Sequence, residues 1–205
     1  MKVAIVNYGN GNFGSLLAAL ARLDLKPSIW QRGSDVHPVD LVIFPGVGAL
    51  PDVMLALSQR DLLVPLTALY HADTPFLGIC LGMQLFFAEG DEGGRGLGWL
   101  KGKVPALAAP ILPHIGWNTV SPDPTHGWLY AGLAANPAFY FVHTYCVEPL
   151  DDSLTAGTTV YHATFPSAVV APPLYGVQFH PELSGRSGHR LLQNLLARIQ
   201  QEARP

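Results

Sequence analysis

The sequence predicts an α/β protein with three layers, in which helices cover both faces of a mostly parallel central sheet that continues into an antiparallel extension. Within residues 1–90, short apolar and β-branched runs alternate with segments whose leucines recur at helical spacing. Such alternation is typical of a parallel sheet between helices. Between residues 104 and 180, strand candidates follow one another with Pro and Gly between them, which predicts antiparallel pairing. A chain of 205 residues, 49% of them hydrophobic, is expected to form a single domain over residues 1–205.

The expected elements of the first half follow from apolar runs, helical periods and Pro/Gly breaks. Strands are expected at residues 3–6, 28–30, 40–44 and 76–80. Helices are expected around Leu16 and Leu20, from Pro51 onward, and over residues 62–70 and 81–88.

The second half is expected to be mostly strands, with one closing helix. The strands are predicted at residues 104–108, 116–120, 139–143, 155–163, 168–171 and 174–180. The apolar residues at positions 191, 192, 195, 196 and 199 form one stripe of an amphipathic helix.

Composition excludes several classes of function. A net charge of −3 does not favour a nucleic-acid-binding protein, which normally carries a basic excess. Cys80 and Cys146 alone offer no disulfide framework, which favours a reducing cytoplasm. No stretch is long and apolar enough for a signal peptide or a membrane span, so no membrane partner is expected.

Residues 78–82 read Gly-Ile-Cys-Leu-Gly and lie where a buried strand gives way to a helix pattern. This layout is typical of a nucleophile elbow, in which a sharp turn raises one side chain above the edge of a sheet. Glycines on both sides of Cys80 relieve crowding at the strained turn. The positive end of the following helix favours the thiolate form. The alternative is a buried structural cysteine, because free cysteine is among the most buried residue types.

Two glycine-rich stretches lie at predicted strand ends. Residues 44–49 read Phe-Pro-Gly-Val-Gly-Ala, and glycines there leave backbone N–H groups able to face a developing oxyanion. Residues 9–14 fit the pattern Gly-x-Gly-x-x-Gly of a dinucleotide-binding turn. That motif needs an acidic residue at the end of the second strand, where the chain has Gln31 and Arg32. A tight turn is therefore the favoured interpretation of residues 9–14.

His180-Pro181-Glu182 ends the last predicted strand. In an extended segment, residues two apart point to the same side, so Glu182 would orient the His180 ring and stabilise its protonated form. The same pair could ligate a metal, but no further ligand cluster supports that alternative. A thiol, an oriented base and a glycine loop at strand ends together predict acyl transfer through a thioester.

These residues resemble a known family, the class I (triad) glutamine amidotransferases. The stretch from Gly78 to Gln84 and the His-Pro-Glu motif resemble the superfamily. The whole chain is similar, more narrowly, to the glutaminase subunits of imidazole glycerol phosphate synthases. The supporting runs are residues 7–12, 45–48, 113–118, 140–145 and 165–169. The resemblance implies a flavodoxin-like fold of this family, no cofactor and no metal.

The resemblance also implies roles for individual residues. Cys80 would attack the side-chain carbonyl of glutamine, His180 would transfer protons, and Glu182 would orient His180. The residues implied to hold the oxyanion are Val47, Gly48 and Leu81. The residues implied to hold the amino-acid end of glutamine are Gln84, Glu92, His143, Thr144 and Tyr145.

The implied partner is a (β/α)₈-barrel cyclase subunit, which receives ammonia and forms a heterodimer with this chain. Together they would make imidazole glycerol phosphate and AICAR in histidine biosynthesis. Two positions depart from the family pattern: Asn7 stands where Asp is usual, and Leu183 where Lys is usual. Both departures concern docking or signalling rather than the triad.

Three rival functions remain open from the sequence. The chain could be the glutaminase subunit of another class I synthase, which shares the triad. It could be a nucleotide-binding module that uses residues 9–14. It could also be a cysteine peptidase or a related thiol hydrolase built on the same elbow.

Overall fold

The computed structural model describes residues 1–9, 13–46 and 48–202. Its elements in the first half are β1 (Val3–Val6), α1 (Gly14–Ala21), β2 (Ser28–Trp30), η1 (Gly33–Asp35), β3 (Leu41–Phe44), α2 (Leu50–Gln59), α3 (Leu63–His71), β4 (Phe76–Ile79), α4 (Leu81–Gln84) and β5 (Phe87–Gly90). The strands of the second half are β6 (Leu100–Val104), β7 (His114–Thr119), β8 (Ser121–Pro122), β9 (Ala138–His143), β10 (Glu148–Pro149), β11 (Thr155–Tyr161), β12 (Ala163–Ala171) and β13 (Leu174–Val177). The helical segments there are η2 (Pro124–Tyr130), η3 (Asp152–Leu154), η4 (Pro181–Leu183) and α5 (Gly185–Glu202).

The central sheet has eight strands in the order β2-β1-β3-β4-β13-β12-β11-β8. Strands β2, β1, β3, β4 and β13 pair in parallel. Strands β12, β11 and β8 then continue the sheet with antiparallel pairing. The mixed sheet of the sequence prediction is thereby confirmed.

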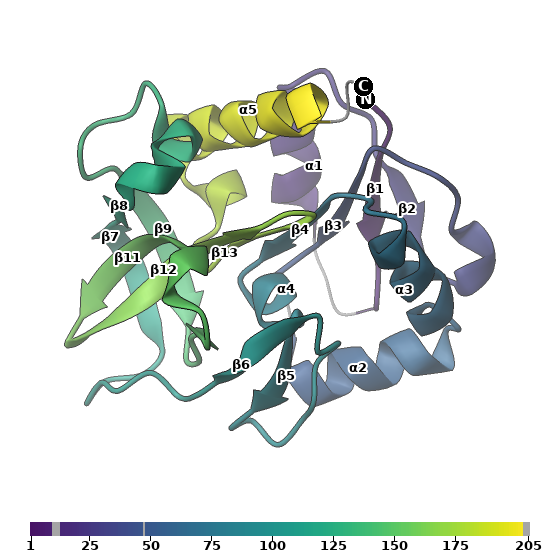
Figure 1. Cartoon of the computed structure of the whole chain (residues 1–205), viewed down its shortest axis with the longest axis horizontal. Helices are drawn as coiled ribbons and strands as arrows, with labels where there is room; N and C mark the ends of the chain where they lie inside the picture. Colours follow the sequence, from purple (N-terminus) through teal and green to yellow (C-terminus); the bar gives the residue numbers. More distant parts are fainter. Residues whose placement is uncertain (10–12, 47, 203–205) are drawn as a thin grey trace.

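Helices cover both faces of this sheet, as Figure 1 shows for α1 and α5 on one side and α2 and α3 on the other. Alternate residues of each buried strand enter different cores, because successive side chains point to opposite faces. In β1, Ile5 packs in the core with α1 and α5, whereas Ala4 packs in the core with α2 and α3. Two apolar cores on either side of one sheet make the three layers.

Two small sheets flank the central one. Strands β10, β6 and β5 form the first, and the antiparallel pair β7–β9 forms the second. Strand β9 is tied to the segment after β13, because His180 N–H donates to Tyr140 O at 2.8 Å. The second small sheet therefore lies against the end of the last parallel strand.

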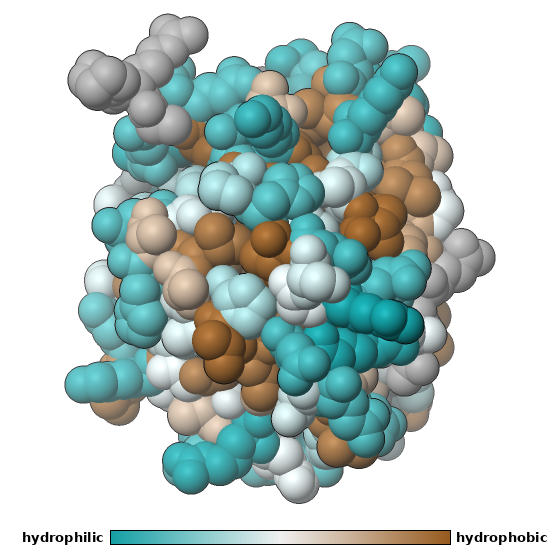
Figure 2. Space-filling model, turned by 90° about the vertical axis from the view of Figure 1, so that its right-hand side faces the viewer, coloured by the Kyte–Doolittle hydropathy of each residue, from teal (hydrophilic) through white to brown (hydrophobic). Residues whose placement is uncertain are grey.

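The surface over α3 and the β2 edge of the central sheet is mainly polar, with apolar side chains in small separate groups (Figure 2). Within residues 1–9, 13–46 and 48–202, no helix combines the length and the apolar character needed to cross a bilayer.

Several element predictions were wrong in detail. The helix expected over residues 81–88 ends at Gln84, and residues 87–90 form strand β5. The strand expected at 104–108 lies earlier, at Leu100–Val104. The strand expected at 155–163 is the hairpin β11–β12, which turns at His162 with φ +59°. A run that is buried on all sides carries no period, so its helix or strand character is ambiguous from sequence.

Candidate active site

Cys80 occupies a strained turn between β4 and α4. Its backbone has φ +50° and ψ −109°, a conformation that a residue with a Cβ adopts only at a cost of about 1–3 kcal/mol. Three backbone hydrogen bonds hold the turn: Cys80 N–H donates to Val177 O at 2.6 Å, and the N–H groups of Met83 and Gln84 donate to Cys80 O at 3.0 and 3.2 Å. The strand–turn–helix layout expected for residues 76–84 is confirmed, although the helix is short.

The glycines of the elbow are required by space rather than by backbone angle. A Cβ on Gly82 would lie 2.1 Å from Phe44 O, and a Cβ on Gly78 would lie 2.5 Å from Gly82 C. Both distances are far below van der Waals contact, so no side chain fits at either position. Helix α4 can therefore sit directly on β3 and β4.

His180 and Glu182 form a close pair beside Cys80. His180 Nδ1 lies 2.8 Å from Glu182 Oε1, and both side chains are largely buried. Their geometry differs from the prediction, because residues 181–183 form the 3-10 turn η4 instead of an extended segment. Pro181 suits the first turn of a helix, and this turn brings the carboxylate back onto the ring.

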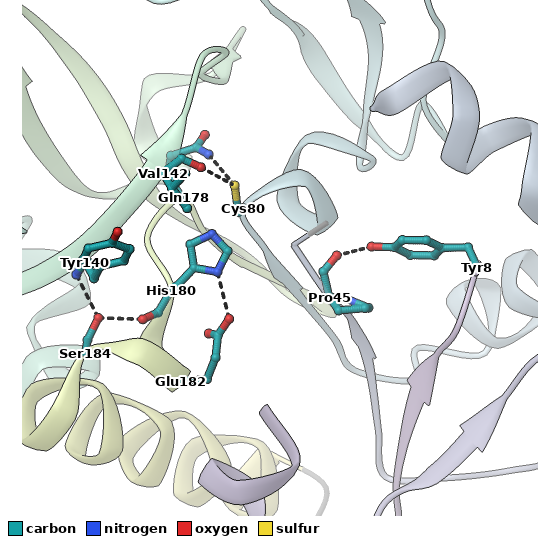
Figure 3. A network of polar contacts seen from close by, with 9 residues as sticks. All are labelled: Tyr8, Pro45, Cys80, Tyr140, Val142, Gln178, His180, Glu182 and Ser184. Carbon is teal, nitrogen blue, oxygen red and sulfur yellow. Dashed lines mark hydrogen bonds and ion pairs between the residues drawn. The ribbon is translucent and has the colours of Figure 1, made fainter. Parts of the chain in front are cut away.

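The protonation of His180 depends on its two neighbours. Burial alone would lower the pKa of His180, but the adjacent Cys80 and Glu182 raise the pKa above its ordinary value. Glu182 accepts the hydrogen of Nδ1, which leaves Nε2 as the nitrogen able to exchange a proton. Figure 3 shows the ring between the two partners, with Nε2 on the Cys80 side.

Cys80, His180 and the glycine loop are packed together. A Cβ on Gly46 would lie 2.7 Å from Cys80 Cβ and 3.0 Å from His180 Cε1. Tyr8 fixes this loop, because its hydroxyl donates to Pro45 O. Among the residues that the structure describes, His180 Nε2 has no hydrogen-bond partner. Catalytic hydrogen bonds are often long or poorly aligned in the free enzyme and shorten when substrate binds.

The residues expected to hold an oxyanion lie at this edge of the sheet. Leu81 is the first residue of α4, so its N–H has no acceptor within the helix and is the nearest backbone donor after Cys80. Gly48 has φ +106°, in the region that favours glycine. Val47 lies outside the described residues. The assignment of these three residues to an oxyanion site stays a prediction.

A cavity of about 300 Å³ opens beside the Cys80 side chain. Its lining includes every described residue that was expected to contact glutamine: Gln84, Glu92, His143, Thr144 and Tyr145. Glu92 Oε2 also accepts from Leu50 N–H at 2.8 Å, at the start of α2. The volume is at the small end for ligand sites, which suits a molecule of amino-acid size.

His143 reaches this cavity with both ring nitrogens already occupied. Its Nδ1 donates to Tyr145 O at 2.8 Å, and its Nε2 lies 3.0 Å from His114 Nδ1. Burial, the largest cause, lowers the pKa of His143 to about 4, so the ring is neutral near pH 7. A direct ring contact with glutamine is therefore disfavoured, and His143 would act by holding the backbone at Tyr145.

Gln178 is the residue near Cys80 that sequence reasoning missed. It is fully buried, and its Nε2 donates to Cys80 Sγ at 3.4 Å. The thiol in turn lies 3.7 Å from Val142 O (Figure 3). Only its place two residues before His180 could have drawn attention to it.

The metal and dinucleotide alternatives concern residues other than Cys80. Within the described ranges, no three His, Cys, Asp or Glu side chains are grouped as metal ligands. Residues 10–12 of the glycine motif at positions 9–14 lie outside the described residues. Cys146 is a second free, buried thiol, and burial raises its pKa to about 12, as expected for an inert structural cysteine.

Comparison with known proteins identifies the family. The family model described as "Glutamine amidotransferase class-I" matches residues 4–199. The chain belongs to the class I glutamine amidotransferase family. The resemblance that rested on the elbow and the His-Pro-Glu motif is thereby confirmed.

Curated relatives within this amidotransferase family cover nearly the whole chain. A protein from Symbiobacterium thermophilum is 43% identical over 196 residues, which span 94% of this chain and 92% of the relative. A protein from Moorella thermoacetica is 40% identical over 195 residues, with the same shares of the two chains. Both are named imidazole glycerol phosphate synthase subunit HisH.

The fold of this chain is also similar to solved structures. A crystal structure described as a glutamine amidotransferase matches with a TM-score of 0.78 and 17% identity, covering 98% of this chain and 100% of that chain. The structure of PurLQS from Thermotoga maritima matches with a TM-score of 0.76 and 16% identity, and the match covers 97% of this chain and 98% of that chain. At these identities the likeness concerns the fold alone.

Proposed function

We propose that this chain is the glutaminase subunit of an imidazole glycerol phosphate synthase, acting in histidine biosynthesis. It hydrolyses glutamine to glutamate and ammonia through a thioester on Cys80. The observation that carries the proposal is Cys80 at φ +50° on a strand–helix turn, packed against the His180–Glu182 pair. The curated relatives named HisH support the choice of synthase.

The reaction follows from the positions of three side chains. His180 takes the thiol proton, and the Cys80 sulfur attacks the side-chain carbonyl carbon of glutamine. The bond from carbon to nitrogen then breaks, His180 returns the proton, and ammonia leaves. Water activated by His180 hydrolyses the thioester, and glutamate departs. Glu182 keeps Nε2 directed at the reacting atoms by holding Nδ1.

The oxyanion that forms during attack needs backbone donors. We assign this role to the N–H groups of Leu81, Val47 and Gly48, which follow Cys80 or lie in the glycine loop. Gln84, Glu92, Thr144 and Tyr145 line the cavity and are assigned to the amino-acid end of glutamine, with His143 as their support.

Ammonia released into water at neutral pH would be protonated and lost as a nucleophile. A (β/α)₈-barrel cyclase subunit that covers the site and receives ammonia through its core would prevent this loss. We propose such a heterodimer, without nucleic acid or membrane, in the cytoplasm. The single domain over residues 1–205 would be the glutaminase half.

An exposed apolar surface supports docking at this place. Ile115 and Trp117 on β7 are 59% and 60% exposed, and Val142, which pairs with Ile115, is 38% exposed. Leu183 is 43% exposed and follows the catalytic pair. Val142 also lines the cavity beside Cys80. An apolar surface at a cavity mouth is typical of a protein interface.

The decisive assay measures ammonia transfer from glutamine to the cyclase product. The purified chain and its complex with the cyclase and the cyclase's nucleotide ligand are each assayed as wild type and as Cys80→Ala, and the cyclase alone serves as the blank. We expect weak glutaminase activity of the lone chain, strong stimulation by the liganded partner, and no glutamine-dependent product with Cys80→Ala. Turnover retained by Cys80→Ala would overturn the proposal, and full activity of the lone wild type would overturn its dependence on the partner.

A further inference from the structure

A line of side-chain amides connects the backbone at Tyr145 to the sulfur of Cys80. Gln84 Nε2 donates to Tyr145 O at 3.0 Å and to Gln178 Oε1 at 3.3 Å. Gln178 Nε2 then donates to Cys80 Sγ at 3.4 Å. Gln84 is only 4% exposed and Gln178 is 0% exposed, so water does not compete for these contacts.

The hydrogen bond from Gln84 to Tyr145 O determines which group donates and which accepts in the other two contacts. A carbonyl oxygen can only accept, so the amide nitrogen of Gln84 faces Tyr145 O. The other hydrogen of that nitrogen points at Gln178 and requires an acceptor, which is Oε1. The amide nitrogen of Gln178 is therefore directed at the sulfur. The reversed amide would bring two NH₂ groups face to face inside the protein, at the cost of unsatisfied buried donors.

The two neighbours of the sulfur respond in opposite ways when the thiol loses its proton. The neutral thiol can direct its hydrogen at Val142 O, 3.7 Å away, while it accepts from Gln178. A thiolate has no hydrogen to donate, so Val142 O becomes a repulsive neighbour. The N–H of Gln178 then makes a charge-assisted hydrogen bond, which is stronger than the neutral one.

We propose that Gln178 is a positioning residue that holds the Cys80 sulfur at the cavity and stabilises its thiolate through an N–H···S hydrogen bond. The consequence for glutamine hydrolysis rests on the proposed function. The effect on the thiol itself does not, and it can be measured on the chain alone.

The first experiment follows alkylation of Cys80 by iodoacetamide as a function of pH, with the modified residue located by mass spectrometry. Gln178→Met keeps the length of the side chain and removes the donor. We expect roughly tenfold slower alkylation at pH 7, because the thiolate loses a charge-assisted hydrogen bond, and a profile shifted to higher pH by about one unit. Ser167→Ala is the matched control, since Ser167 is buried on the neighbouring strand and pairs with Gln178 through the backbone only.

A second variant adds a signature that a structural role cannot produce. Gln178→Glu presents a carboxyl group that donates when protonated and repels the thiolate when ionised. We expect its alkylation rate to fall below that of Gln178→Met once the carboxyl ionises. An unchanged profile in Gln178→Met, or an equal shift in Ser167→Ala, would overturn the proposal.

The wild type provides a measurement that needs no substitution at Gln178. With ¹⁵N-labelled glutamine side chains, the Nε2 resonance of Gln178 should move with the same pH midpoint as Cys80 alkylation, and should stay constant in Cys80→Ala. A Gln178 Nε2 resonance that does not change as the Cys80 thiol titrates would contradict the hydrogen bond.

In the complex with its partner, Gln178→Met should lower kcat about tenfold with little change in KM. If the wild-type complex releases no ammonia while the alkylation shift is found, the proposed function fails and the role of Gln178 stands.

Discussion

The two sides of the candidate site are built by different means. On the β4–α4 side, the backbone fixes Cys80: a positive φ, three backbone hydrogen bonds and glycines with no room for a Cβ. On the β13–η4 side, backbone hydrogen bonds with Tyr140 and Leu183 hold the main chain of His180, and side chains complete its placement. Glu182 holds the ring, and Ser184 Oγ donates to His180 O at 2.6 Å. The backbone thus places the Cys80 thiol, whereas the orientation of the His180 ring depends on a side-chain contact with Glu182.

This difference predicts unequal responses to substitution. Changes on the Cys80 side should affect folding and activity together, because they move the backbone. Changes on the His180 side should affect activity first, because the fold does not depend on the ring.

The largest effect is expected for Gly82→Ala. Its Cβ would lie 2.1 Å from Phe44 O and 2.8 Å from Phe44 C, so α4 must move off β3. We expect a loss of several kcal/mol in the free energy of unfolding, or no folded protein, measured by denaturant titration. Gly127→Ala is the control, because nothing lies within 4 Å of a Cβ there, and its stability should stay within about 0.5 kcal/mol. Equal stability of the two variants would contradict the packing argument.

Gly46→Ala should act on the contact between the two sides. The added Cβ would press on Cys80 Cβ and His180 Cε1 and separate the thiol from the ring. A displacement on the order of 1 Å costs about a hundredfold in rate, so glutaminase activity of the complex should fall by at least that factor. Circular dichroism should show a folded chain; activity within threefold of the wild type would show that the loop is free to adapt.

Glu182→Gln should affect activity without unfolding the chain. The amide can still accept from Nδ1, but it carries no charge to stabilise the imidazolium. We expect kcat to fall roughly a hundredfold, while the melting temperature changes by only a few degrees. If kcat stays near the wild-type value, Glu182 is not the orienter of His180.

The smallest effect is expected from His143, as a dependence of stability on pH. The folded state protonates His143 near pH 4, whereas the unfolded chain protonates it near pH 6.5. The unfolded state binds more protons between these values, so the stabilisation is complete above pH 6.5 and is lost as pH falls toward about 4. The loss is at most about 3 kcal/mol.

Two variants isolate this contribution. His143→Gln should flatten the fall in unfolding free energy between pH 6.5 and about 4, because the titrating group is gone. His71→Gln, at an exposed position, should keep the wild-type slope. An unchanged slope in His143→Gln would show that another group causes the loss of stability at low pH.

The elbow was predictable because its signals are local. Glycines at 78 and 82 and a strand followed by a helix lie within a few residues of Cys80, and each has a steric meaning. The proximity of His180 and Glu182 was also predictable from their spacing, although η4 rather than an extended segment brings them together.

What the sequence could not predict depends on distant contacts. Gln178 and Cys80 are 98 residues apart, and nothing near Gln178 indicates which side chain its amide will face. Strand β5 was missed for a related reason: residues 81–87, which lead into it, are all buried, so this run has no polar face from which to read a period. Tertiary packing decided both outcomes.

The most direct test of the central claim is covalent labelling of the wild-type chain with an electrophilic glutamine analogue, followed by mass spectrometry. Cys146 is an internal control, because it is a second buried thiol whose pKa is raised to about 12. The account predicts one adduct, on Cys80, that excess glutamine prevents and that Cys80→Ala abolishes. Labelling of Cys146 to the same extent, or a Cys80 adduct that glutamine does not suppress, would contradict it.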